Sequence, residues 1–287
     1  MPFFWNVLMK QHGSIAGNQT LGSAAHPTNN LLFSYPGYSE IMTGEARDDV
    51  ITSNARIQNR FMSFLQFLKK KMDLNRNQVA SFSSWETMNE IVSSRADEFT
   101  INAGFERYVN GDPDANRLSE NQFETPTPWD SVRHDYYTLG LALSHMKKYR
   151  PRVVHIGLGE TDDWAHNRRY DRVLDALNRT DQYLKTLWEF LNEDISYKGK
   201  TSLIITVDHG RGVSKDDWHG HGKDIPGARD VWVAFITPDS MLRGEWKNTK
   251  PVYLNQIAAT LCRLLGFDYS EQNRNAGKAI RQILVEQ

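Results

Sequence analysis

The stretch from residue 202 to residue 222 constrains this chain more than any other. An apolar, β-rich run, Ser202-Leu-Ile-Ile-Thr-Val207, leads directly into Asp208-His209-Gly210, and His221 follows a polar loop. A short run of this kind between turn residues predicts a buried strand of a parallel sheet. Ligand sites in open α/β sheets lie beyond the carboxyl ends of the strands. The stretch therefore predicts a strand that carries metal ligands at its end, although Asp-His-Gly alone is also compatible with a capped turn.

A second cluster upstream has the same layout. The run Arg152-Val-Val-His-Ile-Gly-Leu158 reads as a strand, and Asp162 and His166 follow it. A carboxylate and an imidazole four residues apart share one face of a helical turn. Two strand ends that each deliver Asp and His favour a metal centre over two unrelated turns.

Composition places the chain among ordinary globular proteins. It has 287 residues and a formal net charge of −1, which gives no broad electrostatic attraction to nucleic acid. The single cysteine, Cys262, cannot form an internal disulfide and lies in an apolar helical run. No segment is apolar for long enough to span a bilayer. The N-terminus lacks the features of a signal peptide and reads as an amphipathic helix stopped by Gly13, so the sequence assigns no compartment.

Strands alternate with helices along the rest of the chain. The alternation predicts an α/β fold, with one mostly parallel sheet sandwiched between helices, in a single domain of residues 1–287. The segment Gly104–Pro128 reads as a long loop. Further strands are expected at Val79–Trp85 and Asp230–Ile236. Helices are expected at Ser39–Thr43 (ended by Gly44), Phe61–Leu68, Glu86–Val92, Ser131–Tyr149, Arg168–Leu191 and Leu254–Leu265.

Taken in order, four blocks resemble the alkaline phosphatase superfamily. The closest pattern is that of its nucleotide pyrophosphatase/phosphodiesterase and cofactor-independent phosphoglycerate mutase-like branches. Asp162-x-x-x-His166 and Asp208-His209-Gly210 are similar to the two metal-binding pairs, and His221-Gly222 is similar to the late histidine. Ser34-Tyr-Pro-Gly-Tyr-Ser-Glu-Ile-Met-Thr-Gly44 resembles the nucleophile segment. Each block alone is weak, whereas all four in the right order across the chain are specific.

The resemblance implies a metal centre with two divalent ions, Zn²⁺ or alternatively Mn²⁺. The first ion would be held by Asp162, His166 and His221. The second would be held by Asp208 and His209 together with the oxygen of Ser34. Asp and His are ligands that Zn²⁺ accepts readily, and a catalytic site keeps one coordination position open. Two such ions can hold both the attacking and the leaving oxygens of a phosphoryl group.

The implied activity is metal-dependent hydrolysis of phosphoric esters through a phosphoserine. Ser34 would be the nucleophile, and Asn54 resembles the asparagine that contacts a phosphoryl oxygen, with a turn or capping role as the alternative. The substrate would be a small-molecule phosphate ester; its identity, and whether it is a monoester or a diester, stay open, as does the oligomeric state. A sulfatase is disfavoured, because Tyr38 stands where that branch has arginine.

One ligand of the family pattern has no counterpart in this sequence. In the family, a first strand ends in an aspartate that binds the second metal, and this strand precedes the helix that Phe3 to Gly13 resembles. We therefore expect an N-terminally incomplete domain whose sheet has an exposed edge. The alternative is a catalytically impaired protein that binds metal without turnover.

Overall fold

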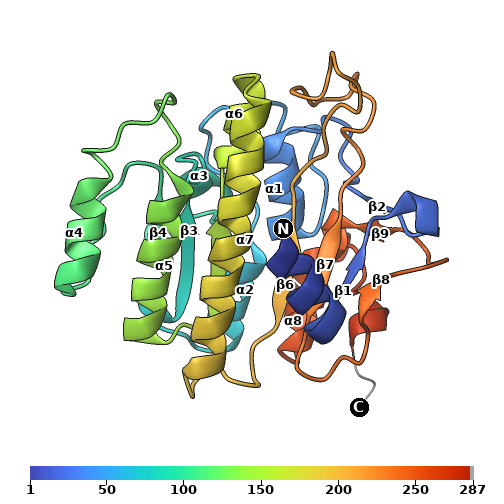
Figure 1. Cartoon of the computed structure of the whole chain (residues 1–287). Coiled ribbons are helices and arrows are strands. Elements are labelled where there is room, and N and C mark those ends of the chain that lie inside the picture. The colour runs from blue at the N-terminus through green and yellow to red at the C-terminus, as the bar shows by residue number, and fades with distance from the viewer. Residues whose placement is uncertain (285–287) are drawn as a thin grey trace. The chain divides into compact units, whose positions relative to one another are not determined.

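The computed structural model describes residues 1–284 and shows an α/β protein, which confirms the predicted fold class (Figure 1). Contacts divide the chain into two compact units. Unit 1 combines Met1–Asn54 with Leu177–Gln287, and unit 2 is the continuous segment Ala55–Ala176. No helix among the described residues is both long and apolar enough to cross a bilayer.

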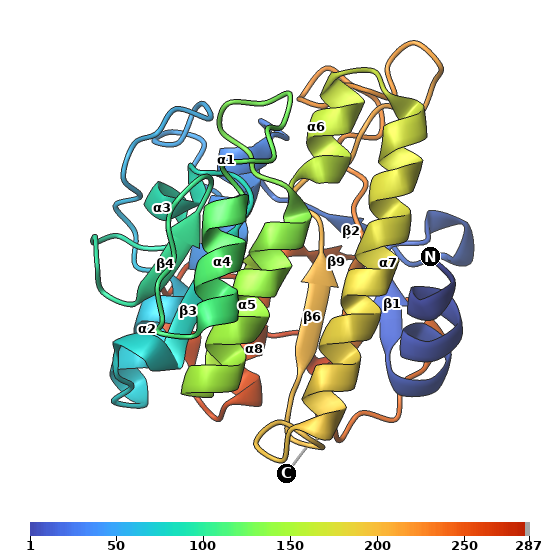
Figure 2. The same ribbon diagram turned by 60° about the vertical axis from the view of Figure 1, so that its left-hand side comes forward.

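Unit 2 is built on a three-stranded parallel sheet. The central strand β3 (Val79–Ser83) pairs with β4 (Thr100–Ala103) on one side and β5 (Val153–Gly157) on the other. All five residues of β3 are buried, as expected for a strand with both faces covered. Helix α5 (Asp135–Tyr149) packs along β3 and β5 (Figure 2). The other α-helices of this unit are α2 (Phe64–Lys71), α3 (Met88–Ile91), α4 (Pro113–Asn121) and α6 (Glu160–His166).

Unit 1 contains a four-stranded sheet of mixed direction. Its order is β6-β7-β1-β8, in which β1 and β8 are parallel and the other neighbours are antiparallel. The strands are β6 (Leu203–Thr206), β7 (Val233–Ile236), β1 (Ser14–Ala16) and β8 (Gly244–Glu245), with a separate parallel pair, β2 (Ala25–His26) and β9 (Val252–Tyr253). The main helices are η1 (Phe4–His12), α1 (Ser34–Thr43), α8 (Ile257–Leu264) and the long α7 (Tyr170–Glu193), which begins in unit 2.

Strand β6 lies at an edge of the sheet in unit 1. Among the described residues it pairs with β7 alone, and that pairing is antiparallel. Its four residues are half-buried, whereas all four residues of β7 are buried. Both faces of β6 are nevertheless covered, because Ile204 packs in one apolar cluster and Leu203 and Ile205 pack in another. The prediction of a buried, parallel strand at this place is therefore wrong, because β6 is half-buried and its pairing is antiparallel.

Two predicted segments have different boundaries. Helix α1 begins at Ser34 instead of Ser39, because Pro36 stands in its first turn, where a missing N–H costs nothing. The segment Gly104–Pro128 is not a continuous loop, since it contains α4. The start of α4 is marked by Asp112, whose side chain accepts a hydrogen bond from Asp114 N, and by proline at the first helical position.

Candidate active site

In unit 1, Asp208 and His209 stand just beyond the carboxyl end of β6, as predicted. The turn that follows requires glycine at position 210. A Cβ there would lie 2.3 Å from the carbonyl oxygen of Gly227, far inside van der Waals contact. The N–H of Gly210 also donates to the carbonyl of Ala228 at 2.8 Å. This close approach of two backbone segments fixes the Asp-His pair at the end of the strand.

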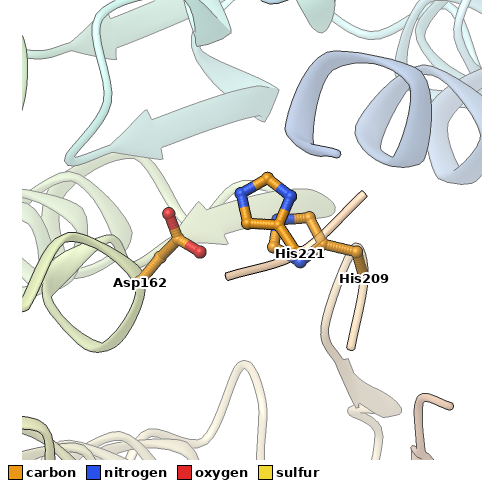
Figure 3. Close-up of side chains that lie close together, drawn as sticks. All are labelled: Asp162, His209 and His221. Atoms are coloured by element: carbon orange, nitrogen blue, oxygen red, sulfur yellow. The ribbon is translucent and has the colours of Figure 1, made fainter. Parts of the chain in front are cut away.

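The rings of His209 and His221 stack on each other in unit 1. Their centroids are 3.9 Å apart with an interplanar angle of 20° (Figure 3). His221 Nδ1 lies 3.0 Å from the carbonyl oxygen of Leu32, and His209 Nδ1 lies 2.9 Å from that of Gly210. Because a carbonyl can only accept, each Nδ1 carries a proton, and in the neutral ring Nε2 then carries the lone pair. The two rings are therefore in the tautomer that binds a metal through Nε2.

Ser34 joins this group as the first residue of α1. Its Oγ lies 3.4 Å from His209 Nε2, and its hydroxyl also hydrogen-bonds with the Asp208 carboxylate. Burial raises the pKa of Asp208, and the neighbouring His209 and the hydrogen bond from Ser34 oppose that rise. The hydroxyl also lies at a helix N-terminus, where backbone N–H groups and the helix dipole favour an anion.

Asn54 contacts the same end of α1. Its Oδ1 accepts a hydrogen bond from the backbone N–H of Tyr35 at 2.8 Å. The side chain is therefore fixed with its carbonyl toward the first turn of the helix, which leaves the NH₂ group as the donor. This orientation is compatible with both the capping role and the phosphoryl contact expected from the sequence.

In unit 2, Asp162 and His166 lie one turn apart on α6, as the four-residue spacing predicted. Asp162 Oδ2 is 3.1 Å from His166 Nε2, and the Asp162 carboxylate is also drawn in Figure 3. The next carboxyl group, that of Asp163, has its pKa raised to about 7. Burial is the main cause and the carboxylates of Asp135 and Glu160 add to it, whereas His166 acts in the opposite direction.

Asp135 and Glu160 are buried carboxyl groups beside α6 that sequence reasoning missed. They are 1% and 2% exposed. The pKa of Asp135 is raised to about 6, because burial and Glu160 outweigh the hydrogen bonds from Ser84 and from the N–H groups of Gly159 and Glu160. Each residue stands at a helix start, where Asp and Glu are common on exposed surfaces. No feature of the sequence distinguishes these two from ordinary first-turn acids.

The predicted site residues thus form two groups. Within unit 1, Ser34, Asp208, His209 and His221 lie together, and Asn54 lies at the same helix end. Within unit 2, Asp162 and His166 form one pair. Hydroxyl, carboxylate and imidazole groups so placed have the chemistry to bind divalent metal ions and to carry out nucleophilic substitution.

Comparison with known families decides the class of the protein. Residues 9–248 match the family of type I phosphodiesterases and nucleotide pyrophosphatases. The chain belongs to this family. It is accordingly a metal-dependent hydrolase that acts on phosphoric ester bonds, in the alkaline phosphatase superfamily that the sequence blocks resemble. Among proteins with curated descriptions, none matches the sequence.

Solved structures share the fold of this phosphodiesterase family member at low identity. Wild-type alkaline phosphatase PafA matches with a TM-score of 0.70 and 11% identity, over 96% of this chain and 93% of PafA. The phosphonate monoester hydrolase of Agrobacterium radiobacter matches with a TM-score of 0.57 and 12% identity, over 95% and 70%. SpPMH, the phosphonate monoester hydrolase from Silicibacter pomeroyi, matches with a TM-score of 0.53 and 11% identity, over 94% and 69%. These matches confirm the alkaline phosphatase-like fold.

Proposed function

We propose that this family member hydrolyses a small-molecule phosphoric ester through a phosphoserine formed on Ser34. The observation that supports the proposal is the place of the Ser34 hydroxyl, 3.4 Å from His209 Nε2 and hydrogen-bonded to Asp208. The hydroxyl lies among the side chains with metal-binding chemistry and at the N-terminus of α1. A divalent ion bound there would activate the serine by coordination, so that no separate histidine base is needed.

We assign two divalent metal ions to these residues, Zn²⁺ or Mn²⁺. Asp208, His209 and the Ser34 oxygen would hold one ion, while the Asp162 and His166 pair of unit 2 would supply ligands to the other. The donor set fits, since it consists of carboxylate oxygens and imidazole nitrogens, and His209 and His221 each donate through Nδ1, which leaves Nε2 as the nitrogen that can bind a metal. When bound, such ions lower the pKa of a hydroxyl and draw charge from phosphoryl oxygens.

The reaction then proceeds in two substitutions at phosphorus. The Ser34 hydroxyl loses its proton to solvent and Oγ attacks, so that a P–Oγ bond forms while the bond to the leaving alcohol oxygen breaks and that oxygen takes up a proton. A water molecule next attacks phosphorus, the P–Oγ bond breaks, and Oγ is reprotonated. The amide NH₂ of Asn54 donates to a non-bridging oxygen, and the first-turn N–H groups of α1 stabilise the negative charge.

A protein that binds metal without turnover is the second candidate. The observation that favours it is the edge position of β6, which leads into Asp208 and pairs on one side only among the described residues. Turnover of phosphate esters by metal-loaded protein separates the two candidates, because only the enzyme releases alcohol.

The test of the nucleophile uses Ser34→Ala with Ser34→Thr as its matched control. Metal-loaded parent protein is mixed with a p-nitrophenyl phosphate monoester or with the corresponding diester and quenched in acid. We expect an acid-stable phosphoserine and p-nitrophenol release in the parent, part of both in the threonine variant, and neither in the alanine variant. Turnover at the parent rate by Ser34→Ala would show that Ser34 is only a helix-start residue. The preferred ester would identify monoester or diester specificity.

A further inference from the structure

We propose that Asp135 and Glu160 are positioning residues, which orient the ligand pair Asp162 and His166 by capping each other's helices. The proposal concerns unit 2 alone. It rests on the function proposed above, because that function makes Asp162 and His166 ligands of a metal ion. Neither Asp135 nor Glu160 is given a role in binding the metal or the substrate.

The first half of this arrangement is the cap that Asp135 provides to α6. Asp135 is the first residue of α5, and its carboxylate accepts hydrogen bonds from the backbone N–H groups of Gly159, at 2.7 Å, and Glu160, at 3.2 Å. These two N–H groups begin α6 and have no partner within their own helix. Gly159, the residue before the helix, has no side chain that could cap them. A residue distant in sequence therefore supplies the cap.

The second half runs in the opposite direction. Glu160 is the first residue of α6, and its Oε1 accepts a hydrogen bond from the backbone N–H of Asp135 at 3.3 Å. The same oxygen lies 2.8 Å from Nδ1 of His134, the residue that precedes α5. The N-termini of the two helices thus face each other. The carboxylate at the start of each helix accepts hydrogen bonds from backbone N–H groups at the start of the other. Because each cap depends on the other helix, the direction of α6 is tied to that of α5.

Buried polar groups hold the Asp135 carboxylate in place. Ser84 Oγ donates to Asp135 Oδ1 at 2.6 Å and lies 2.8 Å from Thr138 Oγ1, to which Arg133 Nε donates at 2.9 Å. Ser84, Thr138 and Arg133 are all 0% exposed. A buried and fully connected network of this kind has few alternative arrangements. It anchors α6 to the parallel sheet, since Ser84 directly follows β3.

Helix α6 needs this anchor because it is short. It has 7 residues, about two turns, and an isolated helix of this length is not stable in water. Asp162 and His166 lie within those two turns with ligand atoms 3.1 Å apart. A change in the direction of α6 would move both ligands together. Supporting groups behind metal ligands typically change metal affinity by roughly 10- to 100-fold when they are removed.

The experiment measures metal affinity by titrating the metal-free protein with Zn²⁺, and coordination geometry by the visible absorption of bound Co²⁺. Four proteins are compared: the parent, Asp135→Ala, Asp135→Asn and Tyr108→Phe. Tyr108→Phe is the matched control, because it removes another buried hydrogen bond of unit 2, from Tyr108 to His145 at 2.6 Å, without touching α6. Urea unfolding of each variant gives the stability change for comparison.

We expect Asp135→Ala to weaken Zn²⁺ binding by roughly 10- to 100-fold and to alter the Co²⁺ spectrum. Asp135→Asn keeps one acceptor oxygen and should recover part of the affinity, whereas Tyr108→Phe should lose stability but keep the parent's affinity and spectrum. Parent affinity in Asp135→Ala, or an equal loss in the Tyr108 control, would overturn the positioning role. If Asp135→Ala does not fold, Asp135→Asn and Glu160→Gln carry the same comparison.

Failure of the proposed function has a different signature. In that case the parent itself binds no Zn²⁺, or Asp162→Ala binds it as tightly as the parent. Either result would show that the residues said to be positioned by Asp135 are not metal ligands, and so would overturn both proposals. A parent that binds Zn²⁺ and loses it in Asp162→Ala, but not in Asp135→Ala, overturns the positioning role alone.

Discussion

Replacing Gly37 by alanine tests how closely the nucleophile helix must approach the metal ligands. Gly37 lies in α1, one turn after Ser34, and the position of its missing Cβ is 2.3 Å from the carbonyl oxygen of Asp208. The same Cβ would be 3.1 Å from the Cβ of Asp208. The φ of Gly37 is not positive, so alanine fits the backbone conformation and only the lack of space opposes it. Glycine here lets α1 touch the strand end that carries Asp208.

The size of the effect follows from these distances. Since real Cβ atoms stay at least 3.0 Å from such neighbours, α1 and the backbone of Asp208 must separate by about 0.7 Å or more. Overpacking typically costs about 1–3 kcal/mol, and replacing glycine by alanine within a helix returns about 1 kcal/mol. The net loss of stability should thus be small, at most about 2 kcal/mol. A displacement near 1 Å at a reacting group, by contrast, costs roughly 100-fold in rate.

The assay compares turnover of an aryl phosphate ester with urea unfolding for Gly37→Ala. Gly140→Ala is the control, because its Cβ would also be too close to a neighbour, at 2.4 Å, but that neighbour is the end of the flexible Leu118 side chain. We expect turnover to fall about 100-fold in Gly37→Ala and to stay at the parent value in Gly140→Ala. Parent turnover in Gly37→Ala would show that the close approach of α1 to Asp208 has no part in the reaction. An equal loss in both variants would trace the effect to helix packing in general.

Two further predictions concern acid stability and the sheet edge. Burial lowers the pKa of His145 to about 4, so its stabilising contribution is complete above pH 6.5 and is lost as the pH falls toward 4. Urea unfolding at pH 7 and pH 4.5 should therefore show a loss of stability that is larger by roughly 2–3 kcal/mol in the parent than in His145→Gln. Amide exchange should be faster in β6 than in β7, because β6 pairs on one side only among residues 1–284; equal protection would mean that another strand covers β6 in solution.

The local placement of most candidate site residues could be predicted from the sequence, because the residues of each pair lie close together in the chain. Asp162 and His166 are four residues apart, so a single helical turn fixes their relation. Asp208 and His209 follow an apolar run, and the end of a strand is where such residues form ligand sites. The same reasoning marked the Ser34 segment, but it placed the start of the helix at Ser39 instead of Ser34.

Contacts between residues that lie far apart in the sequence could not be predicted in this way. Asp135 caps a helix that begins at Gly159, and nothing in the sequence near Asp135 shows that its partner N–H groups lie there. The stacking of His209 on His221 depends on the course of the intervening loop. Helix α4 is different, because Asp112 and Pro113 form a local start signal that was outweighed by the polar composition around it.

The pairing of β6 depends on non-local contacts that an apolar run does not specify. The run Ser202–Val207 contains no charge and no proline, the residues that usually protect a sheet edge. Its side chains are covered on both faces, which is typical of an interior strand, yet among the described residues only β7 pairs with it. Asp208 and His209 follow this strand directly, so any motion of β6 moves two of the proposed ligands. Metal binding at Asp208 and protection of the β6 amides should therefore rise together, because ordering either one restricts the other.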